Sequence, residues 1–374
     1  MQIIPVTWSR ARGWQFGDDA STAQAVVYFV SPSILAGHDV YAPLRAQYPH
    51  ARILGCSTGG EIAGPEVNDD SISAAAIRFD SSHVEMASVR LADFEDSRAA
   101  GAALARNMPR EGLRALFVLA DGMLTNGTLL VNGLRDVLPP DVLLTGGLAG
   151  DGADFQHAFV GADAPPAEGI VAALGLYGER LRFGWGSYGG WEPFGPERIV
   201  TRSDGNTLYE LDGEPALDLY KRYLGNEAAN LPGSGLLFPL AVRRPGDEAN
   251  TLVRTMVGFS EDQKTLLFAG DVPQGSQAQL MRGSFPALVE GAAHAGGQAA
   301  LTDGPVLALL VSCIGRKLMM GQRIADEVEA VADILGPNAT QIGFYSYGEI
   351  APHQNSGRSE LHNQTMTITT ISEG

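Results

Sequence analysis

One order of elements recurs along the chain and limits the folds open to it. A continuous β-rich apolar run typical of a buried strand is followed by an amphipathic helix, a second strand that enters a glycine-rich loop, and a closing pair of strands. In the first instance, over about residues 24–91, these are the strand Val26–Ser31, the helix marked by Tyr41, Leu44 and Tyr48, the strand Arg52–Gly55, and the pair Ile72–Phe79 and Val84–Leu91.

Two further instances have the same order. Over about residues 114–190 they are the strands Ala115–Leu119 and Val142–Thr145, the helix face Leu130, Leu134 and Val137, and the closing pair Gly169–Leu174 and Leu181–Trp185. Over about residues 305–372 they are the strands Val306–Val311 and Gln341–Gly343, the helix stripe Ile324, Val328, Val331 and Leu335, and the final strand Thr365–Ile371.

A residue motif shared by two of the loops supports the repetition. The loops Gly55–Ala63 and Gly343–Ala351 both fit Gly-x4-Gly-Glu-Ile-Ala, at a constant offset of 343 − 55 = 288 residues. Chance alternation in an α/β protein explains the order of elements but not this match. We predict an α/β fold, with α+β as the alternative, in which repeated units form helix-covered mixed sheets.

The length of 374 residues is expected for two or three domains or one large composite. A turn at Leu211–Pro215, followed by a helical stretch at Ala216–Leu224, suggests a division there. We expect one domain over 1–213, with the first two units, and a second over 214–374, with the third.

Charge excludes two classes of partner. The net charge of −17 argues against binding to nucleic-acid phosphates or to an anionic membrane surface. The longest strongly apolar run, Val306–Ile314, is nine residues, whereas a bilayer span needs about twenty. Because the N-terminus lacks an export signal and the two cysteines form no disulfide framework, we expect a cytoplasmic protein.

Catalytic motifs are weak. Gly55–Gly59 fits the G-x-S-x-G elbow around Ser57, but that turn must run into a helix and Gly64-Pro65 breaks one. Cys56 is expected to be a small core residue, since a reactive thiol needs a nearby base or helix N-terminus. We therefore expect no enzyme, with a hydrolase or acyl-transferase using Ser57 or Cys56 as the alternative.

The seven histidines are dispersed and form no zinc motif, so we expect no metal site. A haem needs only one axial histidine in an apolar pocket, which leaves no spacing signature. His294 and His362 are the candidates for that role. Haem is accordingly the one cofactor that the histidines leave open.

Polar residues at strand ends are the candidate ligand-binding groups, because ligands of open α/β folds bind beyond the carboxyl ends of strands. Arg316 has a planar fork that suits a carboxylate. Glu61 and Glu349 either hold an amino group or cap backbone amides of the glycine loops. The candidates are Glu61, Asp151, Arg316, Glu349, His362 and Asn363.

Five motifs in the right order make the chain similar to the FIST sensory family over nearly its whole length. They are Gly55–Ile62, Gly205–Gly213, Ser312–Arg316, Gly343–Ile350 and His362–Thr365. The resemblance makes residues 1–213 FIST N-like and residues 214–374 FIST C-like.

The resemblance implies an intracellular, non-enzymatic signalling input module that binds a small ligand, usually proposed to be amino-acid-like. Many relatives are fused to output domains, and we expect this chain to signal to a separate protein such as a histidine kinase or a cyclic-di-GMP enzyme. Some standalone relatives are described as haem-binding nitric-oxide sensors that control a histidine kinase, which is the alternative function. The resemblance transfers no catalytic residues.

Overall fold

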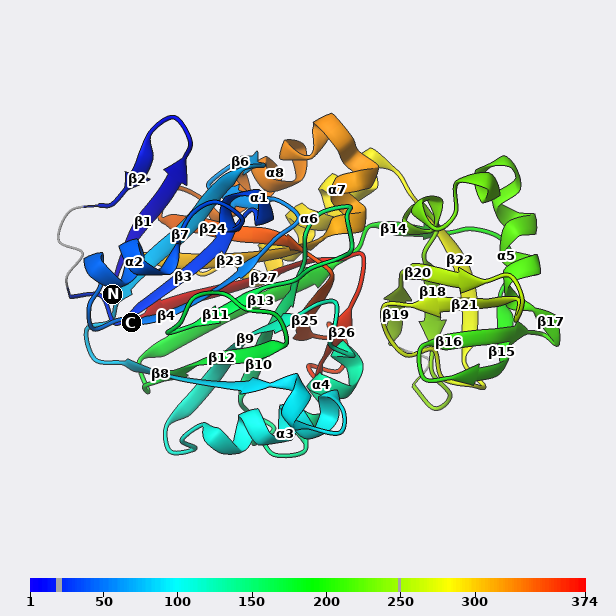
Figure 1. The fold of residues 1–374 in the computed structure, drawn as a ribbon, viewed down its shortest axis with the longest axis horizontal. Coiled ribbons are helices and arrows are strands. Elements are labelled where there is room, and N and C mark those ends of the chain that lie inside the picture. The colour runs from blue at the N-terminus through cyan, green and yellow to red at the C-terminus, as the bar shows by residue number, and fades with distance from the viewer. Residues whose placement is uncertain (18–21, 248–249) are drawn as a thin grey trace.

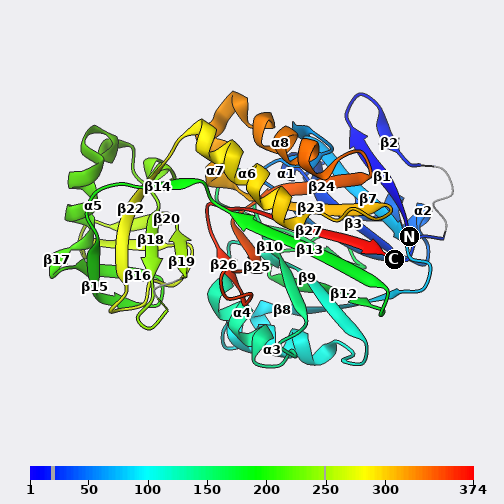
Figure 2. The same ribbon diagram turned by 180° about the vertical axis from the view of Figure 1, so that it is seen from behind.

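The computed structural model describes residues 1–17, 22–247 and 250–374. They form a larger body and a smaller lobe, which lie side by side along the longest axis of the molecule (Figures 1 and 2). The lobe comprises residues 191–283 and is inserted between a strand and a helix of the body. Both chain termini lie at the end of the body farthest from the lobe (Figure 1).

Three six-stranded sheets form the body. The first sheet has the order β11 (Val160–Ala162), β4 (Arg52–Ser57), β3 (Ala25–Val30), β7 (Ser71–Arg78), β1 (Gln2–Ser9), β2 (Gly13–Gln15). The second has the order β26 (Ser359–His362), β25 (Gly348–Pro352), β10 (Leu143–Ala149), β9 (Leu113–Asp121), β12 (Ile170–Tyr177), β8 (His83–Arg90). The third has the order β13 (Leu181–Tyr188), β27 (Met366–Glu373), β23 (Val306–Cys313), β24 (Ala339–Ser346), β5 (Glu61–Ala63), β6 (Glu66–Asn68).

The three sheets share one topology. In each, a central strand (β3, β9 or β23) is parallel to one neighbour and antiparallel to the other. All residues of β3 and β23 are buried, as expected for strands covered on both faces. This arrangement confirms the predicted α/β class and the repeated strand–helix–strand–loop–strand units.

Each unit extends the sheet of another unit by one or two short strands. β5 of the first unit pairs with β24 of the third, β11 of the second pairs with β4 of the first, and β25 of the third pairs with β10 of the second. The exchange is cyclic, so it links all three units into one body.

The closing strands differ from the prediction. β8 was expected to close the first unit, but it pairs with β12 in the second sheet. The strand expected at Leu181–Trp185 to close the second unit is β13, and it pairs with β27 in the third sheet. An alternating strand pattern shows which face is buried but carries no information on the partner strand. In each sheet, the strand at one outer edge comes before the sheet's own unit in the chain.

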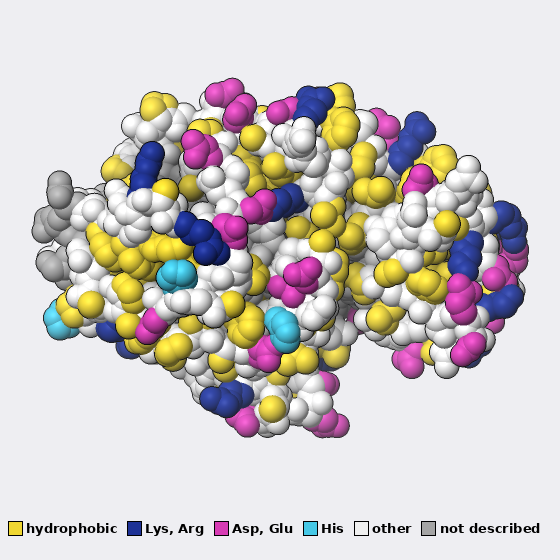
Figure 3. All heavy atoms as spheres, turned by 45° about the horizontal axis from the view of Figure 1, so that its top comes forward, with side chains coloured by type: hydrophobic (Ala, Val, Ile, Leu, Met, Phe, Trp, Pro, Cys, Tyr) yellow, Lys and Arg dark blue, Asp and Glu magenta, His cyan; other side chains and the backbone are white. Residues whose placement is uncertain are grey.

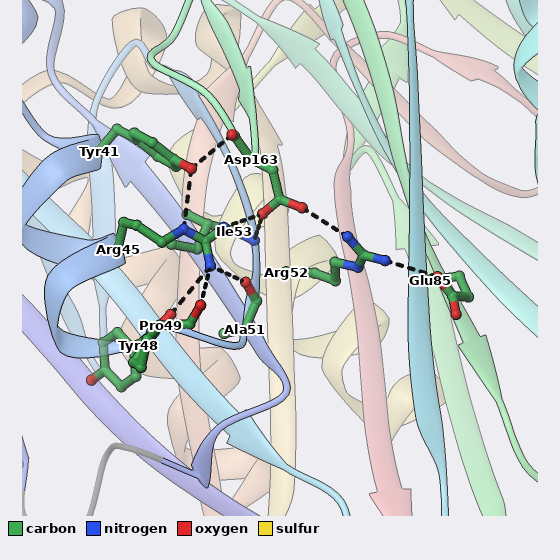
Figure 4. A network of polar contacts seen from close by, with 9 residues as sticks. All are labelled: Tyr41, Arg45, Tyr48, Pro49, Ala51, Arg52, Ile53, Glu85 and Asp163. Atoms are coloured by element: carbon green, nitrogen blue, oxygen red, sulfur yellow. Dashed lines mark hydrogen bonds and ion pairs between the residues drawn. The ribbon is translucent and has the colours of Figure 1, made fainter.

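A polar network holds the exchanged strand β11 against the first unit (Figure 4). Asp163 follows β11 and its carboxylate accepts from the guanidinium groups of Arg45 at 2.6 Å and Arg52 at 3.2 Å. The same carboxylate accepts from the backbone N–H of Ile53 at 2.9 Å. Arg52 also pairs with Glu85 of β8 at 3.2 Å, so the network reaches the second sheet (Figure 4).

A ring of three backbone hydrogen bonds joins the ends of β4, β10 and β24. The N–H of Gly150 donates to the carbonyl of Ser57 at 3.2 Å, that of Tyr347 to Leu148 at 3.0 Å, and that of Gly59 to Tyr345 at 2.8 Å. The three carbonyls occupy equivalent positions in the three units. The ring therefore fixes the loops beyond these strands relative to one another.

Helices cover the outer faces of the sheets (Figure 1). Helices α2, α4 and α8 connect the parallel strands of the three units, and Asn126 caps α4 by accepting from the N–H of Leu129 at 3.0 Å. None of the helices that the structure describes is long and apolar enough to cross a bilayer. The helices are α1 (Pro32–Leu35), α2 (Tyr41–Gln47), α3 (Ser97–Asn107), α4 (Gly127–Arg135), α5 (Ala216–Leu224), α6 (Phe285–Ala299), α7 (Ile314–Met320) and α8 (Ala325–Leu335).

The lobe is a curved sheet with α5 packed against it (Figure 1). Its strands are β14 (Trp191–Pro193), β15 (Arg198–Asp204), β16 (Thr207–Leu211), β17 (Glu214–Pro215), β18 (Leu240–Arg243), β19 (Thr251–Arg254), β20 (Met256–Ser260), β21 (Thr265–Phe268) and β22 (Gln277–Gly283). The predicted helix at 216–224 is α5. Residue 213 lies in the turn between β16 and β17, inside the lobe, and the domain boundary drawn there stays a prediction.

Candidate functional site

A cavity of about 370 Å³ lies where the body meets the lobe. The two parts are separated by a waist in the space-filling view (Figure 3). On the body side it is lined by residues just beyond β9, β10 and β23, which is the carboxyl end of parallel strands where α/β folds bind ligands. The lobe contributes strands β20 and β21 and the turn at Asn206.

The lining combines an apolar wall with a few polar groups. The ring of Tyr347 stacks on that of Phe155, with centroids 4.8 Å apart. The hydroxyls of Thr125 and Thr255 are buried and find no hydrogen-bond partner among the described residues. No charged side chain lines this cavity within the described part of the chain. Such a lining suits an uncharged, largely apolar ligand that supplies one or two hydrogen bonds.

Hydrogen bonds tie the lobe to the body beside this cavity. Arg254 of the lobe donates to the carbonyl of Leu361 at 3.1 Å and, within the lobe, to that of Asp271 at 2.9 Å. Burial lowers the pKa of Arg254 to about 10. Asn126 of the body donates to the Asp271 carboxylate at 3.2 Å. Asp271 is therefore a point of contact between the two parts.

Glu61 borders a second cavity of about 350 Å³, together with Asp151 and Lys317. The Glu61 carboxyl is fully buried and accepts from the hydroxyl of Thr58 and, at 2.8 Å, from that of Ser71. Burial raises its pKa to about 7, although these hydrogen bonds act in the opposite direction. Glu61 thus caps its own loop at the edge of a cavity, and its contact with an amino group stays a prediction.

Glu349 repeats this arrangement in the third unit. It accepts from the Ser346 hydroxyl at 2.7 Å and from the Thr365 hydroxyl at 2.9 Å and N–H at 3.2 Å. Burial raises its pKa to about 8. Unlike Glu61, it lines none of the cavities described here, so its contacts are those of a loop cap.

Asp151 lies beyond β10 and serves two segments. One carboxylate oxygen accepts from the N–H groups of Gln156 at 2.9 Å and His157 at 2.8 Å, and the other accepts from the Tyr347 hydroxyl. Because Tyr347 lines the first cavity and Asp151 the second, this contact lies between the two.

Arg316 is turned away from both cavities. Its guanidinium is fully buried and pairs with Glu327 of α8 at 2.7 Å. It also donates to the backbone carbonyls of Leu288, at 2.9 Å, and Gly189. All three nitrogens therefore have protein partners, and the arginine holds α6, α8 and β13 together instead of facing a ligand carboxylate.

His362 borders a third cavity, of about 250 Å³, and Asn363 follows it. The Nε2 atom of His362 bonds the carbonyl of Ala351 at 3.0 Å, and burial lowers its pKa to about 3, which keeps the ring neutral. The buried amide of Asn363 has no partner for either polar atom among the described residues. Neither residue lines the cavity that Glu61 and Asp151 share.

The two histidines do not suit a haem. His294 is exposed on α6, where its ring packs against that of Tyr188 at 4.7 Å, so no apolar pocket surrounds it. His362 is buried, but the 250 Å³ cavity beside it is below the usual size of even a drug-sized ligand site. Three or more His, Cys, Asp or Glu residues suited to a metal ion do not gather anywhere in the described residues.

Ser57 and Cys56 lack the surroundings of a nucleophile. The Ser57 hydroxyl is fully buried and accepts from the N–H of Phe159 at 2.9 Å. The Cys56 thiol is also buried, and burial raises its pKa well above the usual value. No histidine among the described residues bonds either side chain. A nucleophile needs such a base, so these contacts are structural.

The structure thus brings Glu61 and Asp151 to one cavity and leaves Arg316, Glu349, His362 and Asn363 outside it. Sequence reasoning missed Thr125, Thr255 and Phe155. They come from loops and strands far apart in the chain and match no motif, so no sequence signal identified them. The lobe that brings Thr255 over the body could not be located from strand patterns alone.

Together, the fold and these cavities define a mixed α/β protein with a candidate binding cavity between a body and an inserted lobe. The FIST N domain model matches residues 24–214 and the FIST C domain model matches residues 216–352, so the chain belongs to the FIST family. FIST domains are associated with sensory and signal-transduction roles.

Similar proteins include an uncharacterised protein of Methanocaldococcus jannaschii, 25% identical over 75% of this chain and 58% of its own length. The chain therefore spans little more than half of that relative. An uncharacterised protein of Mycobacterium tuberculosis is 24% identical over 88% of this chain and 86% of its own length. A crystal structure of cyanuric acid hydrolase from A. caulinodans covers 78% of this chain and 99% of its own at 12% identity and a TM-score of 0.19, which supports no argument.

Proposed function

We propose that this protein is a sensor that binds a small, largely apolar ligand in the cavity between body and lobe and signals to a separate protein. The observation that carries the proposal is the pair of buried hydroxyls of Thr125 and Thr255 at that cavity, which have no hydrogen-bond partner in the part of the chain that the structure describes. Buried hydroxyls normally have a hydrogen-bond partner, and a ligand that bonds both removes this cost. One threonine belongs to the body and the other to the lobe.

A ligand held by both parts favours the arrangement in which they lie close together. It shifts the equilibrium between lobe positions by as much as its affinities for those positions differ. The partner would read the position of the lobe. A histidine kinase or a cyclic-di-GMP enzyme, as the resemblance implies, fits this scheme equally well.

The amino-acid-like ligand implied by the family resemblance is the second candidate, and the cavity beside Glu61 and Asp151 is its site. The carboxylate of Asp151 suits an ammonium group, and Lys317 at the same cavity suits a carboxylate. The two candidates place the ligand against different residues, so variants distinguish them.

The test is thermal unfolding of the full chain against amino acids, organic acids and uncharged aromatic compounds. A specific ligand at a hundredfold excess over its Kd stabilises by about 2.7 kcal/mol. Thr255→Val should abolish most of the shift from a ligand of the first cavity, and Asp151→Asn that from an amino acid. Thr7→Val, an exposed threonine on β1, is the control. If no compound raises the melting temperature, or if Thr255→Val and Asp151→Asn leave every shift intact, the proposal fails.

The enzyme and haem alternatives have less support. Hydrolysis by Ser57 or Cys56 lacks a base among the described residues, and neither His294 nor His362 combines an apolar setting with a haem-sized cavity. Addition of haemin provides a direct check, because specific binding would give a Soret band that His362→Ala removes.

A further inference from the structure

Two arginines that form no ion pair with a carboxylate line one groove of this acidic protein. The net charge is −17, and within the described residues the side chains of Arg114 and Arg135 donate to carbonyls and a hydroxyl and form no ion pair with a carboxylate. Both line the same groove, of about 600 Å³, at the amino ends of β9 and β10. This is the end of the second sheet opposite to the cavity between body and lobe.

Arg135 is held in place and keeps a free donor. Its two terminal nitrogens donate to the carbonyl of Val142 at 3.0 Å and to the Ser359 hydroxyl at 2.5 Å. Its Nε is buried and has no acceptor among the described residues. Burial and the neighbouring charge of Arg358 both lower its pKa. An anion bound in the groove beside this guanidinium would offset both effects on its pKa.

The rest of the groove adds positive charge and an aromatic surface. Arg114 makes only long contacts, of 3.4 and 3.5 Å, with the carbonyls of Gly178 and Glu179. Arg182 also lines the groove and pairs with the exposed Asp303 at 3.3 Å. Among the described residues that line the groove, Asp141 is the one carboxylate, against three arginines. Trp185 and Phe183 of β13 line the same groove.

We propose that this groove binds a small organic phosphate with a planar ring, of the nucleoside monophosphate class. The guanidinium forks of Arg135 and Arg114 match phosphate oxygens, and the indole of Trp185 offers a face for the ring. The volume lies within the range usual for small-molecule sites. The site is independent of the one proposed above, since no residue lines both.

The test is calorimetric titration of the full chain with AMP, inorganic phosphate and adenosine at low ionic strength. AMP should bind more tightly than phosphate or adenosine alone. Arg114→Gln should weaken AMP binding about tenfold, the loss of one charged hydrogen bond. Trp185→Leu should weaken AMP binding but leave phosphate binding unchanged. Arg114 and Trp185 carry the test because Arg135 also supports its surroundings.

Two controls keep the result specific. Arg90→Gln removes an exposed arginine at the opposite end of the second sheet and should leave AMP binding unchanged. Thr255→Val, which alters the other cavity, should also leave it unchanged. The proposal is overturned if AMP does not bind, if it binds no better than phosphate, or if Arg114→Gln and Trp185→Leu both bind AMP as the unaltered chain does.

Discussion

The first and third units hold an equivalent glutamate in equivalent hydrogen bonds but support it differently. Glu61 and Glu349 each accept from a hydroxyl three residues earlier and from a residue near the start of the unit's last strand. Glu61 then faces a cavity with Lys317, whereas Glu349 is enclosed. The glutamate therefore shapes the loop in both units, and its neighbours decide whether it can meet a ligand.

The residues behind the two loops differ as well. At the position of Ser57, the third unit has Tyr345, whose hydroxyl donates to Glu327 at 2.9 Å. Glu327 is the partner of Arg316, so a buried ion pair stands behind the third loop. The first loop has instead the hydrogen bond from the Phe159 N–H to Ser57. The third unit should thus be the more sensitive to loss of one charged group.

The largest effect is expected for Arg316→Leu. It leaves Glu327 buried without a counter-charge, which should lower the free energy of unfolding by about 3–5 kcal/mol. Urea denaturation measures the loss. The double variant Arg316→Leu, Glu327→Leu should recover most of it, because no unpaired charge remains. A loss below about 1 kcal/mol for the single variant would contradict the importance of the pair.

Next in size is the pH dependence given by the two glutamates. Their folded pKa values, about 7 and 8, lie above the unfolded value near 4.3. Their stabilising contribution is therefore complete below about pH 4.3 and is lost as the pH rises through 7 and 8. The loss is larger for Glu349 than for Glu61, because burial raises the pKa of Glu349 further. Glu349→Gln should flatten the fall in unfolding free energy between pH 5 and 8.5.

Glu61→Gln should flatten the same curve less, because its pKa shift is smaller. Glu66→Gln, an exposed glutamate of β6, is the control and should leave the curve unchanged. Parallel curves for all three variants and the unaltered chain would show that neither carboxyl is protonated near neutral pH in the folded protein.

A smaller effect is expected where the first unit receives its exchanged strand. Asp163→Ala removes the acceptor for Arg45, Arg52 and the Ile53 N–H, and should cost about 1–2 kcal/mol. The exposed pair of Arg98 and Asp136 provides the comparison, and Asp136→Ala should cost less than Asp163→Ala because solvent screens the exposed pair. Equal losses would mean that Asp163 does not secure β11.

The smallest effect is expected for Ser57→Ala, which removes the acceptor of the Phe159 N–H and should cost about 1 kcal/mol. A ligand-induced rise in melting temperature should persist in this variant. Loss of the response with the fold intact would favour the enzyme alternative instead.

Sequence patterns predicted the helices and strands within each unit better than the contacts between units. The run at Val306 predicted β23, and the stretch after Pro215 predicted α5 residue for residue. The shared loop letters predicted the equivalence of Glu61 and Glu349. All three depend on residues close together in the chain, where period and turn chemistry act directly.

The remaining features depend on long-range contacts. The cyclic exchange of β5, β11 and β25 needs partner strands that a period of two does not specify. Arg316 was expected at a ligand because it follows a strand, but Glu327, eleven residues later on another helix, binds it instead. Thr255 enters its cavity only through the position of the lobe.

The ring of backbone hydrogen bonds at Ser57, Leu148 and Tyr345 explains why sequence comparison reveals two of the repeats more readily than all three. Main-chain amides make all its bonds, so a hydroxymethyl, an isobutyl and a phenol side chain serve there equally well. Substitutions at these positions leave the hydrogen bonds intact as long as the backbone conformation is kept. The three units therefore remain similar in backbone geometry where their amino-acid sequences are no longer similar.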